Sequence, residues 1–525
     1  MICRLKTVAF DGIEAKLVEV QVGISSGMPG FVIVGLPDKA INESRERVRA
    51  VFAMLGVEFP HEHVTVNLKP ADLLKEGAHF DLPIALGVLG AMKLVNQQML
   101  QNFIFMGALS LDGTLEKVNG VLPAGVRALA EKFGLVCPRA NAYEALWSQC
   151  HPILAAEHIT ELLNHFADKK MMKPLDDYTE NLAQKTARQQ LNYPFDFADV
   201  KGQESAKRAM LIAAAGGHNL LMIGPPGSGK TMLAERLVTI LPPLNVRQAL
   251  ENAMIRSVAG VLQDNDAADD EVLDLRRPFR APHHSASMPA LVGGGRRAVP
   301  GEISLAHNGV LFLDELPEFS RVTLDALRQP LESKKAVVAR VEAHTTYPAN
   351  FQLIAAMNPC RCGFLGTKGK MCAKAPKCAE EYLHRISGPF LDRFDMAIEV
   401  PAVSPYDLTS DKKGTSSADM REKVMAAREI AAERFATFGA RNLCCNADLI
   451  GEFLHKALDF DAEMRDFAAK TAEKCGLTAR SFNKILRLAR TIADLQNQKK
   501  VAKMHLIEAL SYRHRLFAKP DREKF

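Results

Sequence analysis

Short runs of hydrophobic residues, separated by polar and glycine-rich segments, recur along this chain. The runs at residues 219–223, 309–313, 351–357 and 396–400 are at most seven residues long and predominantly apolar, which is typical of buried β-strands. The segment after the first run, residues 232–238, has the composition and spacing of a helix. Together these patterns predict an α/β protein.

Two polar segments divide the chain into domains. Residues 168–194 are rich in Lys and Gln and lack periodicity, so we interpret them as a linker. The linker separates an α/β N-terminal domain, residues 1–167, from a second α/β domain, residues 195–402. A stretch rich in Ser, Asp and Lys at 404–420 indicates another flexible connection. Residues 403–525 are therefore expected to hold a connector and a helical domain.

The composition favours an intracellular protein. With 525 residues, the chain is long enough for several domains that each have a core. The longest apolar run, residues 82–94, is interrupted by Lys93 and is too short to span a bilayer, so we expect no membrane partner. The start of the chain does not resemble a secretory signal. Ten cysteines without a small disulfide scaffold fit a reducing cytoplasm.

The strongest motif follows the first predicted strand and precedes the predicted helix. It fits the phosphate-loop pattern G-x-x-x-x-G-K-[ST] at every fixed position. In such a loop, backbone N–H groups surround the phosphates, the lysine reaches the β- and γ-phosphates, and the hydroxyl ligates Mg²⁺. The chain is therefore expected to bind ATP and Mg²⁺. The expected ATP-binding residues of the loop are Gly224, Pro225, Pro226, Gly227, Ser228, Gly229, Lys230 and Thr231.

Two later strands end in polar residues that suit hydrolysis of the bound nucleotide. The strand at 309–313 is followed by Asp314, expected to hold Mg²⁺, and Glu315, expected to activate the attacking water. The strand at 351–357 is followed by Asn358, which can sense the γ-phosphate or position the water, although Asn-Pro is also an ordinary turn.

The order of these parts resembles an AAA+ ATPase. The resemblance implies that Arg393, in the segment before the strand at 396–400, is an arginine finger inserted into a neighbouring subunit. It also implies that Arg480 is the second sensor in a helical lid, and that Val200 and Gln203 belong to the segment that holds the adenine. For each arginine a surface ion pair is the alternative interpretation.

Other segments are similar to the ComM/YifB family, in the magnesium-chelatase-like branch of AAA+ proteins. They lie at residues 23–37, 277–287, 292–295 and 300–309. The resemblance implies a hexameric, ATP-driven motor on single-stranded and branched duplex DNA, of the helicase or branch-migration type, which acts in recombination during natural transformation. The alternatives are a chelatase-like motor subunit that remodels a protein partner, and a DNA scaffold that uses ATP only for assembly.

Contacts with DNA are expected in insertions of the core rather than at its nucleotide site. Lys and Arg that contact phosphates supply affinity independent of base sequence. The first insertion, between the helix at 232–238 and the strand at 309–313, offers a basic string that includes Arg277, His283 and His284. Four arginines across the two insertions are singled out as DNA-binding candidates: Arg280, Arg296, Arg297 and Arg340.

A basic stripe is also expected in the helical domain. Arg480, Lys484, Arg487 and Arg490 recur at helical spacing, and most of the excess positive charge of the chain lies in residues 421–525. Side chains directed at phosphates would explain the stripe, and so would an ordinary solvated helix face.

The N-terminal domain resembles the proteolytic domain of Lon, which has the ribosomal-protein-S5 domain 2-like fold. The segment that corresponds to the nucleophile loop carries His79 in place of serine, and the segment 119–125 offers no catalytic lysine. A Ser–Lys dyad requires both groups. We therefore expect no protease activity, and a scaffold or DNA-binding role remains open.

Four cysteines lie close together after Asn358, within residues 360–378. Four thiols in one short segment suit a tetrahedral structural Zn²⁺, although the spacing is looser than that of paired C-x₂-C knuckles. Four unrelated buried thiols are the alternative. The expected zinc ligands are Cys360, Cys362, Cys372 and Cys378.

Overall fold

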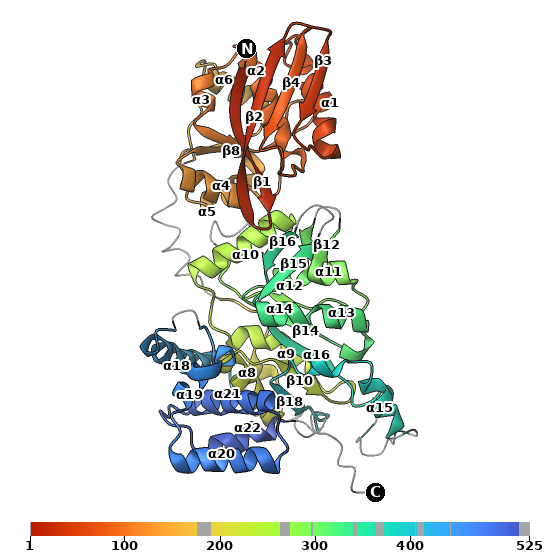
Figure 1. Cartoon of the computed structure of the whole chain (residues 1–525), viewed down its shortest axis with the longest axis vertical. Coiled ribbons are helices and arrows are strands. Elements are labelled where there is room, and N and C mark those ends of the chain that lie inside the picture. The colour runs from red at the N-terminus through yellow and green to blue at the C-terminus, as the bar shows by residue number, and fades with distance from the viewer. Residues whose placement is uncertain are drawn as a thin grey trace.

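The protein forms three tiers that follow one another along its longest axis (Figure 1). In this computed structural model the N-terminal domain lies at one end, a second α/β domain in the middle and a helical domain at the other end. The structure describes residues 2–175, 191–262, 273–295, 298–339, 344–363, 365, 372, 374, 376–404, 406, 414–440 and 443–513.

The N-terminal domain is built on a seven-stranded mixed sheet of order β3-β4-β2-β1-β5-β8-β9. The pairs β1/β2 and β2/β4 are antiparallel, and the other pairs are parallel. The strands of this sheet are β1 (Ile2–Asp11), β2 (Glu14–Ser25), β3 (Gly30–Val34), β4 (His63–Lys69), β5 (Phe103–Phe105), β8 (Gly134–Pro138) and β9 (Ile153–Ala156). A separate antiparallel pair is formed by β6 (Ala108–Leu109) and β7 (Leu115–Glu116). The helices are α1 (Lys39–Met54), α2 (Asp81–Ala91), α3 (Gln97–Leu100), α4 (Val121–Glu131), α5 (Ala142–Trp147) and α6 (Ile159–Phe166).

Helix α2 explains the longest apolar run of the sequence. Every residue of α2 is buried, and the helix packs on β1 and β2. A helix that is apolar all round is expected where it is enclosed by other elements. Among the described residues, the helices are too short or too polar to cross a bilayer.

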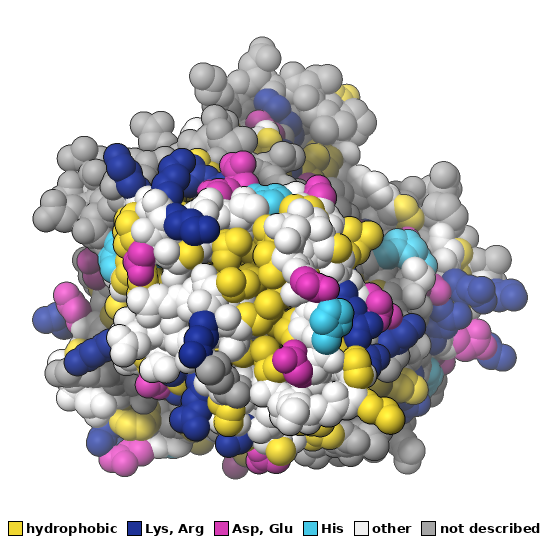
Figure 2. Space-filling view, turned by 90° about the horizontal axis from the view of Figure 1, so that it is seen from above, with side chains coloured by type: hydrophobic (Ala, Val, Ile, Leu, Met, Phe, Trp, Pro, Cys, Tyr) yellow, Lys and Arg dark blue, Asp and Glu magenta, His cyan; other side chains and the backbone are white. Residues whose placement is uncertain are grey.

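The end of the N-terminal domain that faces away from the other tiers has a mixed surface. Figure 2, viewed from above, shows hydrophobic side chains grouped near the centre, with Lys and Arg interspersed with Asp and Glu around them. A surface that grips nucleic-acid phosphates usually carries clustered positive charge. This end of the domain therefore does not resemble such a surface.

The middle domain contains a five-stranded parallel sheet of order β11-β14-β17-β10-β18. The strands of this sheet are β10 (Leu220–Ile223), β11 (Phe279–Arg280), β14 (Val310–Leu313), β17 (Gln352–Met357) and β18 (Met396–Glu399). Two separate antiparallel pairs are formed by β12 (Gly293–Gly294) with β13 (Val299–Pro300), and by β15 (Lys335–Ala339) with β16 (His344–Pro348). The helices are α8 (Glu204–Gly216), α9 (Lys230–Ile240), α10 (Val246–Ala259), α11 (Met288–Val292), α12 (Glu302–Leu305), α13 (Arg321–Ala326), α14 (Arg328–Ser333), α15 (Lys377–Leu383) and α16 (Gly388–Leu391). The four buried strands predicted from apolar runs are confirmed as β10, β14, β17 and β18.

The helical domain, called the lid below, packs on the middle domain. It consists of α18 (Ser417–Thr437), α19 (Gly451–Leu458), α20 (Ala462–Lys474), α21 (Ala479–Leu495) and α22 (Lys503–Ser511). Helix α18 packs on α8 and α9, and α21 packs on α8. One hydrophobic cluster runs from the parallel sheet through α8 into these lid helices. The lid is therefore joined to the sheet by a shared core.

The N-terminal domain docks on the middle domain through α10. Leu122 of α4 is buried in a cluster with Ala249 and Ala253 of α10, and Trp147 packs against the same cluster. The buried carboxylate of Glu144 accepts hydrogen bonds from Leu122 N and from Ser257 Oγ of α10. Burial raises the pKa of Glu144, while these hydrogen bonds oppose the increase. The interface thus combines apolar packing with satisfied polar groups.

Candidate nucleotide site

The phosphate loop connects β10 to α9 at the carboxyl edge of the parallel sheet. Gly227 and Gly229 have φ of +74° and +84°, a backbone region that glycine adopts without strain. Lys230 is the first residue of α9, and its Nζ donates to the carbonyl oxygens of Gly224 and Pro225 at 2.9 Å. A helix N-terminus behind a glycine-rich turn is an arrangement that binds phosphate. The residues present therefore fit a nucleotide.

The two carboxylates lie beside this loop because β14 is close to β10 in the sheet, with only β17 between them. Thr231 Oγ1 donates to Asp314 Oδ2 at 2.8 Å. A hydroxyl and a carboxylate oxygen side by side are ligands that suit Mg²⁺. Burial lowers the pKa of the Lys230 ammonium, and the negative charges of Asp314 and Glu315 oppose that shift. The geometry therefore fits a magnesium ion between Thr231 and Asp314.

Glu315 has an unusual backbone and an unexpected neighbour. Its φ is +49°, which is sparsely populated for a residue other than glycine and is typical of functional sites. Its Oε2 lies 3.4 Å from Nδ1 of His284, in the loop that follows β11. The sequence suggested His284 as part of a basic string for DNA rather than as a neighbour of the carboxylate. The parallel pairing of β11 with β14, invisible in the sequence, brings the two together.

Asn358 and Gln203 complete the surroundings of the phosphate loop. Strand β17 pairs with β10 up to Met357, so Asn358 emerges next to the loop, and its Oδ1 lies 3.4 Å from Lys230 Nζ. Gln203 donates from Nε2 to Ser228 O at 2.6 Å, and Val200 is buried. The segment predicted to hold the adenine is therefore attached to the phosphate loop.

The predicted arginine finger, Arg393, and the predicted second sensor, Arg480, lie together, and Glu332 is their shared partner. Arg393 Nη2 is 2.6 Å from Glu332 Oε1, and Arg480 Nη2 is 3.4 Å from the same oxygen. Arg480 also pairs with Asp392 at 3.5 Å. Within the described part of the chain, neither side chain has a recorded hydrogen bond or ion pair with the phosphate loop. They therefore lie together outside the pocket formed by the same chain.

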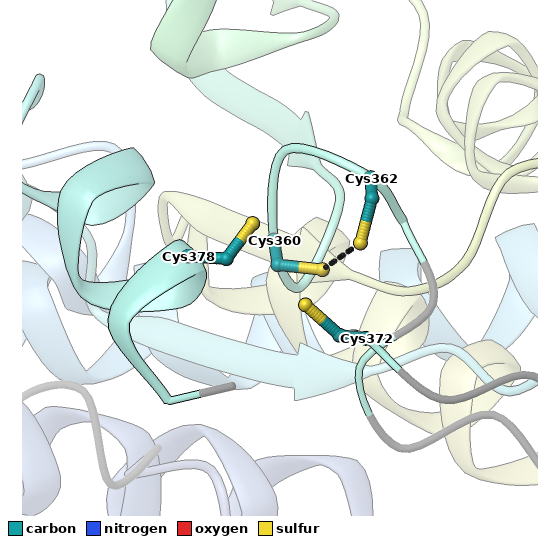
Figure 3. A group of neighbouring side chains, drawn as sticks. All are labelled: Cys360, Cys362, Cys372 and Cys378. Carbon is teal, nitrogen blue, oxygen red and sulfur yellow. Dashed lines mark hydrogen bonds between the residues drawn. The ribbon is translucent and has the colours of Figure 1, made fainter. Parts of the chain in front are cut away.

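The four cysteines come together in space, as Figure 3 shows. Their sulfur atoms all lie within 4.8 Å of one another, and Sγ of Cys360 is 3.2 Å from Sγ of Cys362. Cys360 and Cys372 are buried. Four thiols that converge from one segment form a donor set that fits a tetrahedral Zn²⁺. A structural zinc would be held by Cys360, Cys362, Cys372 and Cys378.

This cysteine cluster lies against the phosphate loop. Gly363, which follows Cys362, has φ of +79°, and a Cβ atom there would be 2.7 Å from Cδ of Pro226. Because Pro226 is inside the phosphate loop, the two loops are in direct contact. Any change in the shape of the cysteine loop would therefore reach the nucleotide site.

Of the four arginines proposed to contact DNA, the structure describes the surroundings of Arg280. Arg280 is half-buried and makes a bidentate ion pair with Glu302, at 2.6 and 2.8 Å. Contact with a phosphate would require this pair to open. Arg296, Arg297 and Arg340 lie outside the described residues.

Arg277 of the basic string is occupied by contacts within the fold. Its side chain is partly buried and donates to Pro242 O and Asn308 O, both at 2.6 Å. Burial lowers its pKa to about 10. Arg277 therefore holds the segment before β11 onto the sheet.

The basic stripe of α21 is not a solvated face. Arg490 is fully buried and pairs with Asp494 at 2.9 Å. Lys484 and Arg487 are largely enclosed, and only Arg480 is about half exposed. Arg490 is thus structural, while the other three face the junction of lid and middle domain.

His79 of the N-terminal domain is a structural residue. Its Nε2 lies 2.9 Å from Val8 O, and its ring packs between Phe10 and Phe80. Burial lowers the pKa of His79, which favours the neutral ring. The position is therefore filled by a buried imidazole that is engaged with the backbone.

The fold and the site define a phosphate-loop nucleotide-binding protein with a C-terminal helical domain. Family models agree with this class. The model described as magnesium chelatase, subunit ChlI, matches residues 196–408. Two further models, for subunit ChlI of Mg-chelatase and for its C-terminal part, match residues 18–141 and 414–513.

The chain belongs to the ComM/YifB family of magnesium-chelatase-like AAA+ proteins. It is 44% identical to the competence protein ComM of Haemophilus influenzae over 96% of this chain and 95% of that protein. It is 41% identical to the protein YifB of Escherichia coli, with the same coverage of each. The magnesium-chelatase 38 kDa subunit of Acidiphilium rubrum is more distant, at 26% identity over 62% of this chain and 92% of that protein.

Proposed function

We propose that this protein is an ATP-driven motor that acts on DNA, and that its active sites are shared between subunits of a ring. The pairing of Arg393 and Arg480 on Glu332 is the observation that carries the shared site. ATP hydrolysis in AAA+ proteins requires positive charge at the γ-phosphate, which an arginine finger supplies. Since both arginines lie together outside the pocket of their own chain, a neighbouring subunit is the natural acceptor. A hexamer is the assembly that we propose.

At each site, we assign the following roles to the residues around the phosphate loop. Lys230 binds the phosphates, and Glu315 accepts a proton from the attacking water once it is free of His284. Asn358 orients the water or the γ-phosphate from the edge of β17. Thr231 and Asp314 would hold Mg²⁺, which neutralises the charge of the phosphates when it is bound.

The proposal of DNA as the partner rests on the relatives. The ComM protein of Haemophilus influenzae is named for competence, and it matches this chain over nearly the full length of both. We therefore propose a helicase or branch-migration activity on single-stranded and branched DNA during natural transformation. A chelatase-like motor that remodels a protein partner is the second candidate, favoured by the family models of magnesium chelatase.

The remaining parts have supporting roles in this proposal. The cysteine cluster holds a structural Zn²⁺ that stiffens the loop against Pro226. The N-terminal domain is a Lon-like fold without protease activity, and it serves as a scaffold attached through α10.

Stimulation of ATP turnover by DNA tests the proposed function. Turnover by the full-length protein is measured with single-stranded DNA, with a branched duplex and without DNA. We expect stimulation by both DNAs and none by a protein partner of the chelatase class. Turnover that is the same with and without DNA would contradict a DNA motor.

Mixed assemblies test the shared site. Arg393→Ala and Lys230→Ala proteins are each expected to be inactive alone. Mixing them should restore part of the activity at interfaces that pair an intact phosphate loop with an intact finger. As a control, Arg465→Ala protein is used in place of Arg393→Ala protein. Arg465 lies on the exposed side of α20, so this variant should remain active alone. Absence of rescue at every mixing ratio would refute a shared site.

A further inference from the structure

A cavity of about 660 Å³ lies between the parallel sheet and the lid. Its walls include Asn219, Gly309 and Asp395. These residues immediately precede β10, β14 and β18, respectively. These are the amino ends of the parallel strands, whereas the phosphate loop follows the carboxyl end of β10. The cavity is therefore at the opposite edge of the sheet from the nucleotide site.

The lining of this cavity carries excess positive charge. Seven of the lining residues are Lys or Arg and four are Asp or Glu. The basic residues come from the middle domain, as with Arg277 and Arg393, and from the lid, as with Arg428 and Arg487. Two domains thus contribute cations to the walls of one cavity.

Two of these cations have no acidic hydrogen-bond partner within the described part of the chain. Arg277 and Arg428 donate there only to backbone carbonyl oxygens, which supply no net charge. Within the described part of the chain, Nε of Arg487 is buried without a hydrogen-bond partner. Buried donors without a partner are costly, so they indicate a missing acceptor.

The electrostatics agree with a missing anion. Burial lowers the pKa of Arg487 and of Lys484, and the nearby positive charge of Arg480 adds to both shifts. Asp395 opposes both shifts, together with Asp448 for Arg487 and Asp392 for Lys484, without reversing them. A bound anion would offset this repulsion and satisfy the free donor in one step.

We propose that the cavity binds a small phosphorylated anion, with Arg487 as a direct ligand and the side chain of Arg428 beside it. Guanidinium groups present several N–H donors in a planar fork that matches phosphate oxygens. The volume exceeds the size of one phosphate group, which suits pyrophosphate or the phosphates of a nucleotide. Because its walls belong to both domains, the bound anion would link the lid to the sheet.

The test is made in full-length protein that carries Lys230→Ala, so that binding at the phosphate loop is removed. Pyrophosphate and ADP are titrated separately by calorimetry at constant ionic strength. We expect saturable binding of pyrophosphate, and binding of ADP as well if the physiological source is a nucleotide. Adding Arg487→Gln should weaken that binding about ten- to hundredfold, because a hydrogen bond to a charged group is lost. Adding Arg465→Gln, an exposed lid arginine outside the cavity, should change nothing.

Thermal unfolding supplies an independent readout. Because Nε of Arg487 is buried without a partner, Arg487→Gln should unfold at or above the wild-type temperature in phosphate-free buffer. Micromolar pyrophosphate should raise the unfolding temperature of the Lys230→Ala protein and leave the double variant unchanged. The proposal is overturned if neither ligand binds the Lys230→Ala protein, or if Arg487→Gln binds as tightly as its parent. These outcomes do not depend on ATP turnover or on DNA.

Discussion

Replacing Gly363 by alanine tests whether the cysteine loop supports the phosphate loop. With φ of +79°, the new Cβ atom would lie 2.7 and 2.8 Å from Cδ and Cγ of Pro226. Real Cβ contacts are not this short. The overlap is relieved when either the cysteine loop or the phosphate loop moves, and in both cases their contact changes.

The free-energy cost of Gly363→Ala has two contributions. A left-handed backbone costs a residue other than glycine about 1–2 kcal/mol. Relief of an overlap in a packed region costs about 1–3 kcal/mol more. Since each 1.4 kcal/mol corresponds to about a factor of ten in affinity, we expect the overlap alone to raise the Kd for ATP about ten- to hundredfold.

A substitution at a second glycine separates the cost of the left-handed backbone from the cost of the overlap. Gly439, in the turn after α18, has φ of +71°, and a Cβ atom at this position would meet no other atom within 4 Å. Gly439→Ala therefore carries the same backbone cost without the overlap, and it should bind ATP as the wild type does. The assay is equilibrium binding of a fluorescent, non-hydrolysable ATP analogue, with zinc content measured on the same samples. Wild-type affinity in Gly363→Ala protein with full zinc content would refute the coupling.

Three further outcomes are expected. Glu315→Gln should bind ATP normally but lose turnover by about 10²–10⁴-fold, measured as phosphate release, because the proton acceptor for water is gone; wild-type turnover would assign that role elsewhere. Elemental analysis should find one zinc per chain, lost in Cys360→Ser but kept in Cys475→Ser, which changes an exposed lid cysteine; zinc-free protein with full ATP turnover would contradict a supporting role. Burial lowers the pKa of His218 from 6.5 to about 4, so the unfolded chain takes up the proton first as pH falls. The contribution of His218 to stability should therefore be full above pH 6.5 and fall by roughly 3 kcal/mol by pH 4; denaturant unfolding of the wild type and of His218→Gln should show this difference in pH dependence.

The sequence was sufficient to predict elements whose determinants are local. Strands β10, β14, β17 and β18 are short apolar runs because a parallel sheet is buried on both faces. Since the carboxyl ends of such strands share one edge, the order of motifs also predicted that Lys230, Asp314 and Asn358 would meet. These residues do lie together.

The features that could not be predicted depend on contacts between distant segments. Arg277 stands in a basic string that looks exposed, yet its side chain reaches Pro242 O and Asn308 O inside the fold. Nothing local distinguishes it from the neighbouring Arg276, which pairs with Asp274 at the surface. Glu332 likewise belongs to no sequence motif, although it pairs with both Arg393 and Arg480. The partners of charged side chains are set by tertiary packing rather than by spacing.

The docking of α10 on α4 determines how this protein can be divided experimentally. Leu250 and Met254 of α10 pack against the cluster that contains Leu122 of the N-terminal domain. A shortened chain that begins at residue 191 would leave these side chains in water, and exposed apolar patches promote aggregation. Polar replacements at Leu250 and Met254 should make such a fragment easier to handle. The linker in the sequence thus marks where the chain can be cut, whereas the two pieces remain physically dependent on each other.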